Sequence, residues 1–243
     1  GPPPRARHTR CGCASTLAFE MSDGPSRVIV NCGGSALAGG LVPAHIGQSL
    51  RATAAHSTLV LDDANSTAVL LHGKLGRGAE TVEVERRIVG RGVGSQRREA
   101  TRVEASHDGY AARFGLMHER ILTIANDGNE IAGEDILVPA SRKGKRGKVG
   151  FAIRFHLGKG VEAHLTEDGM GASLLTPDGK LWQLRLRSDA PGSSEGCEDI
   201  KLTRDDSLWV DGEGRPHATE QLVIEGLASR SGGQFSWLLK KMG

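Results

Sequence analysis

The sequence predicts an all-β fold, a large antiparallel β-sandwich of stacked sheets with little helix. Short apolar runs recur along the 243 residues, and many alternate apolar and polar residues, as in "LWQLRLR" (181–187). Alternation with a period of two places one face of a strand on a core and the other in solvent. Asp-Gly pairs follow several of these runs, as in "PDGK" (177–180), and they are a strong hairpin signal. Strands and turns spaced regularly over this length indicate a sandwich.

Turn residues divide the chain into fifteen expected strands, each a short run rich in apolar or β-branched residues. In the first half they are residues 16–22, 27–32, 57–63, 67–71, 80–89, 97–107 and 118–125. In the second half they are residues 130–139, 149–157, 162–166, 171–176, 181–188, 208–210, 218–227 and 235–241. Helix is expected only in two alanine-containing pieces, 47–55 and 109–120. No repeat of fixed period and no linker is visible, so we expect one domain over residues 1–243.

Composition excludes two classes of partner. Basic and acidic residues nearly balance, 31 to 29, whereas a dedicated nucleic-acid binder has a clustered basic excess. The single basic cluster, "RKGKRGK" (142–148), is interpreted as a solvated loop, with an anion-contacting loop as the alternative. No run of eighteen apolar residues exists, so no membrane span is expected.

Localisation is open between the cytoplasm and the periplasm of the bacterial cell envelope. The N-terminal stretch "GPPPRARHTRCGC" lacks the apolar middle of a signal peptide. The four cysteines match neither a zinc ribbon nor a dense disulfide framework, which favours a reduced, intracellular state.

A lone histidine stands just before an expected strand. His56 lies in "TAAHSTL", flanked by alanine, serine and threonine and by no charge. A neutral imidazole in such a place is an ordinary hydrogen-bonded core residue, a metal ligand or a proton-transfer group. The residues around it leave these three readings open.

Several segments, taken in order, resemble the C-terminal β-sandwich domain of heparinase II/III-like polysaccharide lyases. "CGCASTLAFEMSDG" (11–24) is similar to a family strand that usually reads His-Gly-His-Ala-Asp or His-Ala-Gly. "IVNCGG" (29–34) is similar to the next strand, and "TAAHSTL" to the family's Ala-His-Asn-Thr-Leu motif. "SHDGY" (106–110) and "IRFHL" (153–157) continue the likeness, which runs over nearly the whole chain.

The resemblance implies a two-part enzyme. Such lyases join an N-terminal α/α toroid, absent from this chain, to the sandwich, and an acidic polysaccharide lies in the cleft between them. They cleave by β-elimination, and the toroid usually supplies the catalytic tyrosine. The resemblance therefore implies the β-sandwich portion of a lyase, inactive without its toroid domain. The alternative is a non-catalytic carbohydrate-binding or scaffold module.

The resemblance also implies a candidate metal site. In some members two histidines and an aspartate of the sandwich hold zinc, and His56, Cys13 and Asn31 occupy the matching positions. A thiolate binds zinc well, whereas an asparagine is a much poorer ligand than an aspartate. Imidazole with thiolate would select zinc over magnesium or calcium. In the alternative interpretation Cys13 and Cys32 are buried fillers, and His56 is buried and bonded to Asn31 or to a backbone carbonyl.

Two residues are weak catalytic candidates. Cys11 falls where family members can have a catalytic histidine, and a thiol cannot replace that charge unless its pKa is lowered. Tyr110 is the only tyrosine, but it follows the Asp108-Gly109 turn signal, so a packed structural role is favoured. His118 and His156 are interpreted as satisfied sheet residues. Arg120 and Arg154 are expected on a solvated or salt-bridged face, with contact to an anionic glycan as the alternative. The sequence assigns no substrate-binding residue.

Overall fold

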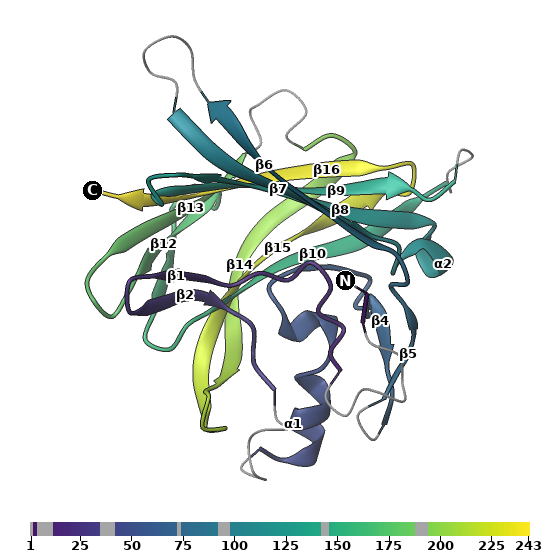
Figure 1. Ribbon diagram of the computed structural model, residues 1–243, viewed down its shortest axis with the longest axis horizontal. Coiled ribbons are helices and arrows are strands. Elements are labelled where there is room, and N and C mark those ends of the chain that lie inside the picture. The colour runs from purple at the N-terminus through teal and green to yellow at the C-terminus, as the bar shows by residue number, and fades with distance from the viewer. Residues whose placement is uncertain are drawn as a thin grey trace.

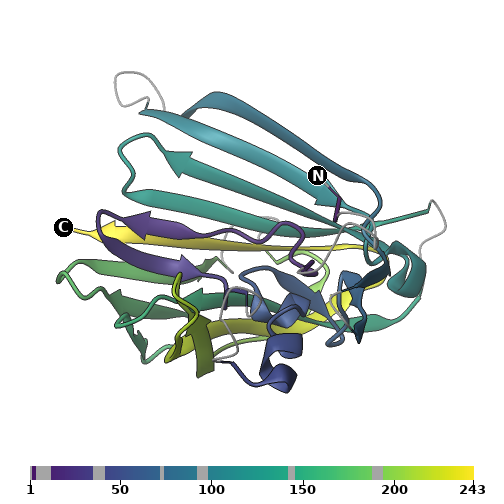
Figure 2. The ribbon, with the colours of Figure 1, turned by 60° about the horizontal axis from the view of Figure 1, so that its bottom comes forward.

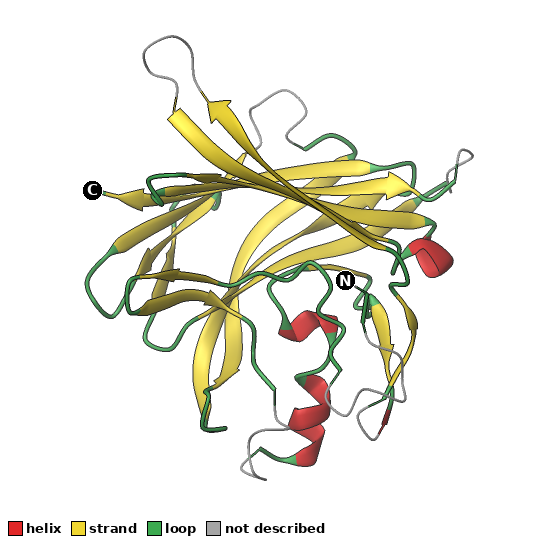
Figure 3. Ribbon diagram, in the orientation of Figure 1, coloured by secondary structure: helices red, strands yellow, loops and turns green. Residues whose placement is uncertain are grey.

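The computed structural model describes residues 2–3, 12–34, 42–71, 74–91, 98–141, 146–187 and 194–243, and it confirms the all-β sandwich. Two antiparallel sheets lie one over the other, and the few helical turns lie outside them, at the bottom and at the right of the view (Figure 1, Figure 3). Within these residues, no helix is long and apolar enough to cross a bilayer.

The larger sheet has eight strands, and its neighbours along the sheet are all antiparallel. In spatial order they are β11 (Glu162–Leu165), β12 (Gly171–Leu175), β13 (Leu181–Arg187), β16 (Gly233–Met242), β9 (Glu130–Pro139), β8 (Leu116–Ala125), β7 (Arg98–His107) and β6 (Val82–Arg91). The last described strand of the chain, β16, therefore lies in the middle of this sheet and not at its edge.

The smaller sheet has six strands. Its main order is β1 (Met21–Asp23), β2 (Ser26–Val30), β10 (Lys148–Leu157), β15 (Pro216–Ser229) and β14 (Cys197–Val210), and β3 (Leu59–Leu61) also pairs with β10. A separate hairpin is formed by β4 (Thr67–Val69) and β5 (Leu75–Gly78). The helical pieces are α1 (Ala44–Ser49), η3 (Thr53–Ala55) and α2 (Ala111–Phe114).

The core forms where the inward residues of the two sheets meet. Trp237 on β16 lies edge-on to Phe155 on β10, with ring centroids 4.9 Å apart, so one aromatic contact joins the sheets. Gly133 on β9 is paired with Trp237 and leaves room for its indole, because a Cβ at position 133 would lie 2.1 Å from the ring. The tryptophan is thus packed directly on the backbone of the neighbouring strand.

Most expected strands are confirmed, and the errors have physical causes. The strand expected at 16–22 contracts to Met21–Asp23, because a turn at Thr16 and Leu17, with Leu17 at φ 59°, breaks the extended chain. β14 begins at Cys197 and not at residue 208, since its charged first part lacks the alternation of a half-buried strand. The hairpin strand β5 was not expected.

Neither expected helix is continuous. Residues 47–55 contain the end of α1 and the separate turn η3, and residues 109–120 contain only the single turn α2 before β8 begins. Gly115, at φ 77°, ends α2 in the left-handed conformation that glycine adopts without strain.

Part of the larger sheet extends past the smaller one. The register places Val84 and Ile88 of β6, Val103 of β7 and Leu122 of β8 on the face that points toward the core side. Val84 is 63% exposed and Ile88 is 70% exposed, so this part of the face is not covered by the second sheet. Figure 2 shows β6, β7 and β8 rising beyond the smaller sheet. We call these four residues the uncovered face.

A Gly133→Ala substitution should destabilise the protein by about 1–3 kcal/mol or more, because the added methyl overlaps the Trp237 ring in a close-packed core. Urea denaturation followed by tryptophan fluorescence measures the loss. The matched control is Gly212→Ala, where a Cβ meets nothing within 4 Å. Equal midpoints for the two variants would contradict this account of the packing.

Candidate functional site

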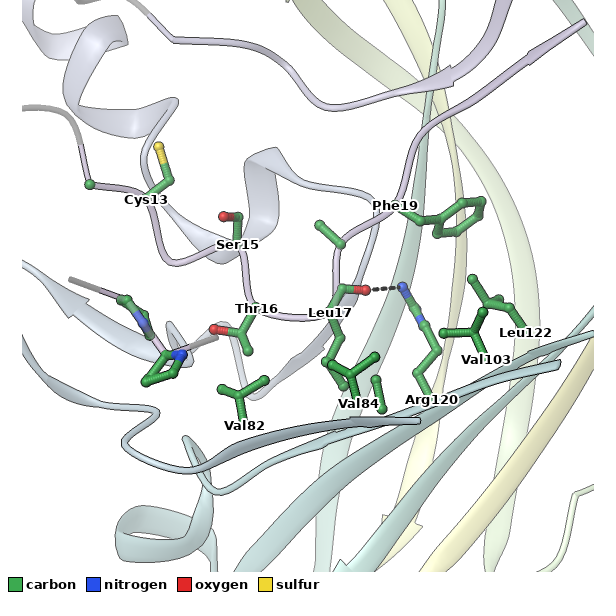
Figure 4. Close-up of a pocket in the computed structure, with 15 residues that line it drawn as sticks. Cys13, Ser15, Thr16, Leu17, Phe19, Val82, Val84, Val103, Arg120 and Leu122 are labelled. Carbon is green, nitrogen blue, oxygen red and sulfur yellow. Dashed lines mark hydrogen bonds between the residues drawn. The ribbon is translucent and has the colours of Figure 1, made fainter. Parts of the chain in front are cut away.

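A pocket of about 710 Å³ lies beside the uncovered face, between it and the irregular segment 12–19 (Figure 4). Val84, Val103 and Leu122 form its floor, and Leu17 and Phe19 come from the opposite wall. Its lining is mainly apolar, and Arg120 is the charged residue that reaches it. The pocket therefore suits a binding partner whose surface is apolar or flat and has a polar edge.

Backbone contacts, and not a strand ladder, hold the segment that forms the upper wall. Buried Arg51 donates to the carbonyl of Gly12 at 2.7 Å and to the carbonyls of Leu70 and Lys74 at 2.9 and 2.8 Å. The Ala14 amide donates to the Arg51 carbonyl at 2.8 Å. One guanidinium thus fixes the segment against the β4–β5 hairpin.

Beneath the pocket, a buried carboxylate gathers three side chains from the larger sheet. Asp135 on β9 accepts hydrogen bonds from Arg120 Nε at 2.8 Å, His118 Nε2 at 2.8 Å and Trp237 Nε1 at 3.0 Å. Burial alone raises the pKa of Asp135, but the Arg120 charge and the His118 bond outweigh it and hold the pKa well below its usual range. Asp135 is therefore ionised and paired with Arg120.

Arg120 extends this network to the pocket wall. Its Nη1 donates to the Leu17 carbonyl at 3.0 Å and to the Ser57 carbonyl at 2.9 Å, and its guanidinium lies over the Phe19 ring. The arginine was expected on a solvated or salt-bridged face. It is 2% exposed, and its charge is neutralised by Asp135 and not available to a ligand as a free cation.

Two histidines continue the network from Asp135 into the sheet. His118 Nε2 donates to Asp135, so its Nδ1 carries the lone pair and accepts from His107 Nε2 at 3.3 Å. His107 Nδ1 in turn accepts from the Gly109 amide at 3.0 Å. Burial lowers the pKa of both rings, that of His107 to about 3, so both are neutral near pH 7. The expectation that His118 is a satisfied sheet residue is confirmed.

His156 on β10 is the centre of a second neutral cluster. Its Nε2 donates to the Ala54 carbonyl at 2.9 Å, and its Nδ1 accepts from the Ser207 hydroxyl at 2.7 Å, with Cys32 Sγ at 3.4 Å. Burial lowers the pKa of His156 to about 4 and raises the pKa of Cys32. The pair is a thiol beside a neutral imidazole, and not the thiolate–imidazolium pair of a cysteine nucleophile.

His56 is buried and bonded to a backbone carbonyl, as one of its alternatives predicted. Its Nδ1 donates to the Ala52 carbonyl at 2.8 Å, which leaves the lone pair on Nε2. Burial lowers its pKa, so the ring is neutral at pH 7. The turn η3 positions the ring, since the His56 amide donates to the Thr53 carbonyl at the end of that turn.

Asn31 lies beside the His56 segment, but its amide group is already engaged. Its Oδ1 accepts from the Ser57 amide at 2.9 Å, and its Nδ2 donates to Glu20 at 3.1 Å. Cys13 lies in the irregular segment, and Figure 4 shows its thiol directed away from Val82 and Val84. The strand expected at 27–32 ends at Val30, so Asn31 lies just beyond β2, and Cys13 lies before the Leu17 turn and outside any strand.

The donors in this region do not fit a zinc ion well. His56 and Cys13 supply two ligands of the usual types, whereas zinc sites use three or four from the protein. In the part of the chain that the structure describes, no three His, Cys, Asp or Glu side chains are grouped to hold a metal. The zinc set of His56, Cys13 and Asn31 stays a prediction, and no chemical step is derived from it.

Of the two weak catalytic candidates, the structure describes only Tyr110. Tyr110 is 1% exposed, its hydroxyl donates to the Leu59 carbonyl at 2.9 Å, and burial raises its pKa, so it is held as a neutral core residue. Asp108 orders the turn before it by accepting from the amides of Glu80 and Thr81. Cys11, and residues 142–145 of the basic cluster, lie outside the described residues.

Asp135 was not identified from the sequence as the centre of a buried hydrogen-bond network. The available signal was a single carboxylate at an inward position of β9, in line with Ile131, Gly133 and Leu137. An acidic residue in an apolar register of a strand is buried only when it is paired. Two partners come from β8, which the Asp127-Gly128 turn places beside β9, and the third comes from β16, which is distant in the sequence.

Comparisons with known proteins agree with the resemblance. A family model described as "Heparinase II/III-like, C-terminal" matches residues 1–238. The FtsZ-localized protein C of Caulobacter vibrioides is 32% identical over an alignment of 206 residues, and the match covers 76% of this chain and 32% of that protein. A heparinase III structure aligns with a TM-score of 0.65 and 14% identity, over 95% of this chain and 30% of that one.

A heparan sulfate lyase from Pedobacter heparinus gives a TM-score of 0.64 at 12% identity, over 94% of this chain and 30% of the lyase. The chain thus spans about a third of the length of the relatives that it matches. At these identities the solved structures establish the fold.

Stability should fall as the pH is lowered from about 6.5 to 4, because two buried histidines must then take up protons. The folded pKa values of His107 and His156 lie below 6.5, so their stabilisation is complete above that pH and is lost as the pH falls toward the folded values. His156 alone should account for on the order of 3 kcal/mol. The urea midpoint should depend less on pH in a His156→Gln variant, whereas a His217→Gln variant should keep the wild-type dependence. A wild-type midpoint that stays constant over this range would contradict the assignment of neutral histidines.

Metal analysis of protein purified without chelators should give zinc well below one ion per chain. The reason is the donor set, since Asn31 is engaged and only His56 and Cys13 remain of the three matched positions. Mass-spectrometric elemental analysis checks this. Stoichiometric zinc that is lost in a His56→Ala variant would overturn the expectation and establish the metal site.

Proposed function

The chain belongs to the family of heparinase II/III-like C-terminal domains, and on this premise we propose that it is the β-sandwich part of a polysaccharide lyase. The substrate class proposed is an acidic, uronate-containing polysaccharide, cleaved by β-elimination. The family match over residues 1–238 and the fold shared with a heparinase III and a heparan sulfate lyase support this.

The uncovered face with its adjoining pocket is the observation that carries the proposal. A solvent-exposed apolar sheet face marks a surface that another body covers. The chain spans about a third of its relatives, and we propose that an N-terminal α/α toroid covers this face. The pocket of about 710 Å³ would then lie at the cleft between the two domains.

In this arrangement the chain forms part of the binding surface and supplies no group that transfers a proton. β-Elimination needs a base for the C5 proton of the uronate, a group that stabilises the charge on its carboxylate, and an acid for the leaving oxygen. The described imidazoles at the sandwich centre are neutral and bonded, Tyr110 is sealed in the core, and Arg120 is paired with Asp135. We therefore assign the proton-transfer groups to the toroid.

The second candidate is a non-catalytic module that binds carbohydrate or serves as a scaffold. It is favoured by the departures from the family's ligand pattern, Cys11, Cys13 and Asn31 in place of His, His and Asp. The Caulobacter relative is named for localisation with FtsZ and not for an enzyme activity. For this chain the scaffold role would use the pocket beside the uncovered face, with a protein partner in place of polysaccharide.

The 243-residue chain alone should release no unsaturated uronate from heparin, heparan sulfate or alginate, because the proton-transfer groups are proposed to lie elsewhere. The ultraviolet absorbance of the conjugated product is the measurement. We expect the native reading frame to extend upstream with a helical pattern, and the longer protein to be active. Activity of the short chain that scales with its concentration would contradict the assignment.

Variants of the longer protein separate the two candidates. Val103→Glu on the uncovered face should lower turnover at least tenfold, whereas the matched control Leu165→Glu, 43% exposed on β11, should leave it unchanged. A longer protein that binds acidic polysaccharide but never eliminates it would favour the binding module and reject the lyase.

A further inference from the structure

The outer edge of β6 differs from the other edges of the two sheets. Natural sheets protect their edges with short strands, bulges or charges, because an unpaired strand offers backbone groups to another chain. Among the described strands, β1 and β11 are short edges of three and four residues, and β14 is interrupted by a bulge between Glu198 and Lys201. β6 has ten residues, pairs with β7 without a register shift, and contains no proline.

The edge also carries exposed apolar side chains. Val84 and Ile88 are among the most exposed large apolar residues of the described chain, at 63% and 70%, and both point to the same face of β6. Two such residues, four apart on an edge strand, would ordinarily favour aggregation. They would form a specific contact with a second copy of β6, because an antiparallel copy carries the same two residues in reverse order.

The sequence of β6 is complementary to itself. Consider two antiparallel copies of the strand with Arg86 opposite Arg86. Val84 of each copy then lies opposite Ile88 of the other, and Glu85 lies opposite Arg87. Directly opposed apolar pairs and opposite-charge pairs both stabilise a sheet, and the symmetry produces each pair twice. The facing Arg86 side chains are the one unfavourable pair, and both are solvent-exposed.

Charges on neighbouring β7 leave Glu85 to be paired from outside. The register sets Glu85 opposite Glu104, a like charge, whereas Arg87 lies opposite Arg102 and forms its ion pair diagonally with Glu104. Glu83, Glu85, Glu104 and Glu119 line a shallow hollow of about 390 Å³ on the outer face of these strands. An incoming arginine at the edge would meet a surface of negative charge there.

We propose that the chain forms a symmetric dimer in which β6 pairs antiparallel with β6 of a second copy, centred on Arg86. The two eight-stranded sheets then join into one continuous sheet, and the uncovered faces of the two copies lie next to each other. Such an interface has the two-fold symmetry in which the same surface is used by both subunits. The inference rests on the edge and its charges, and not on the proposed function.

Sedimentation equilibrium of the 243-residue chain should show a dimer. Ile88→Asp should shift it to a monomer, and Leu165→Asp, an exposed apolar residue on the opposite edge strand, should not. Circular dichroism confirms that the variants are folded. A monomeric wild-type chain at the highest concentration reached, or equal effects of the two substitutions, would overturn the proposal.

A charge exchange tests the pairing directly. Glu85→Arg and Arg87→Glu should each weaken the dimer at least tenfold, and the double variant should recover most of the loss because it restores both cross-strand pairs. Arg86→Thr should tighten the dimer, since it removes the facing like charges. Failure of the double variant to recover would reject this register.

Cross-linking fixes the centre of symmetry. Under oxidation, Arg86→Cys should give a covalent dimer, and Glu83→Cys should not, because its two copies would lie roughly 20 Å apart along the strand. A Glu83→Cys cross-link of equal yield would overturn the register. The same measurements should be repeated on a longer native protein. If the dimer is lost when the upstream region is present, that region binds the β6 edge, and the proposal is overturned.

Discussion

The Asp135 carboxylate is the interaction on which the rest of the sandwich depends. It joins β9 to β8 through His118 and Arg120 and to β16 through Trp237, and Arg120 then holds the carbonyls of Leu17 and Ser57. A buried ion pair of this kind contributes little net stability by itself, but the loss of one partner leaves an uncompensated charge at a cost of about 3–5 kcal/mol. The pair therefore fixes one arrangement of the pocket wall over the sheet.

The same burial explains why the described histidines at the centre of the sandwich are not proton-transfer groups. Imidazoles at His107, His118 and His156 have their nitrogens committed to backbone, carboxylate, hydroxyl or neighbouring rings, and desolvation keeps them neutral. Groups held in one tautomer by several bonds are good structural elements and poor proton carriers. What the described chain offers a ligand is a shaped, mostly apolar surface beside a neutralised arginine.

Strand positions could be predicted from sequence wherever alternation was strong. β9 was predicted to the residue, because its inward positions are apolar apart from Asp135, and β10 and β13 were predicted to within one residue. The first part of β14 could not be predicted, since its residues are mostly polar on both faces and its place in the sheet comes from pairing with β15. For the site, the local sequence left three interpretations of His56 open, and the structure shows the buried, carbonyl-bonded one. The network around Asp135 also needs Trp237 of β16, and no local pattern places that distant strand beside β9.

The central position of β16 has a consequence for biosynthesis. Residues 233–242 separate β13 from β9, so until they leave the ribosome the larger sheet exists as two halves, each with an open edge facing the other. Closing the sheet requires contacts between strands that are distant in the chain, a topology that folds slowly and exposes strand edges meanwhile. During this interval the nascent chain is open to pairing with other strands, and a ribosome that stops before residue 233 releases a product with no means of closing its main sheet.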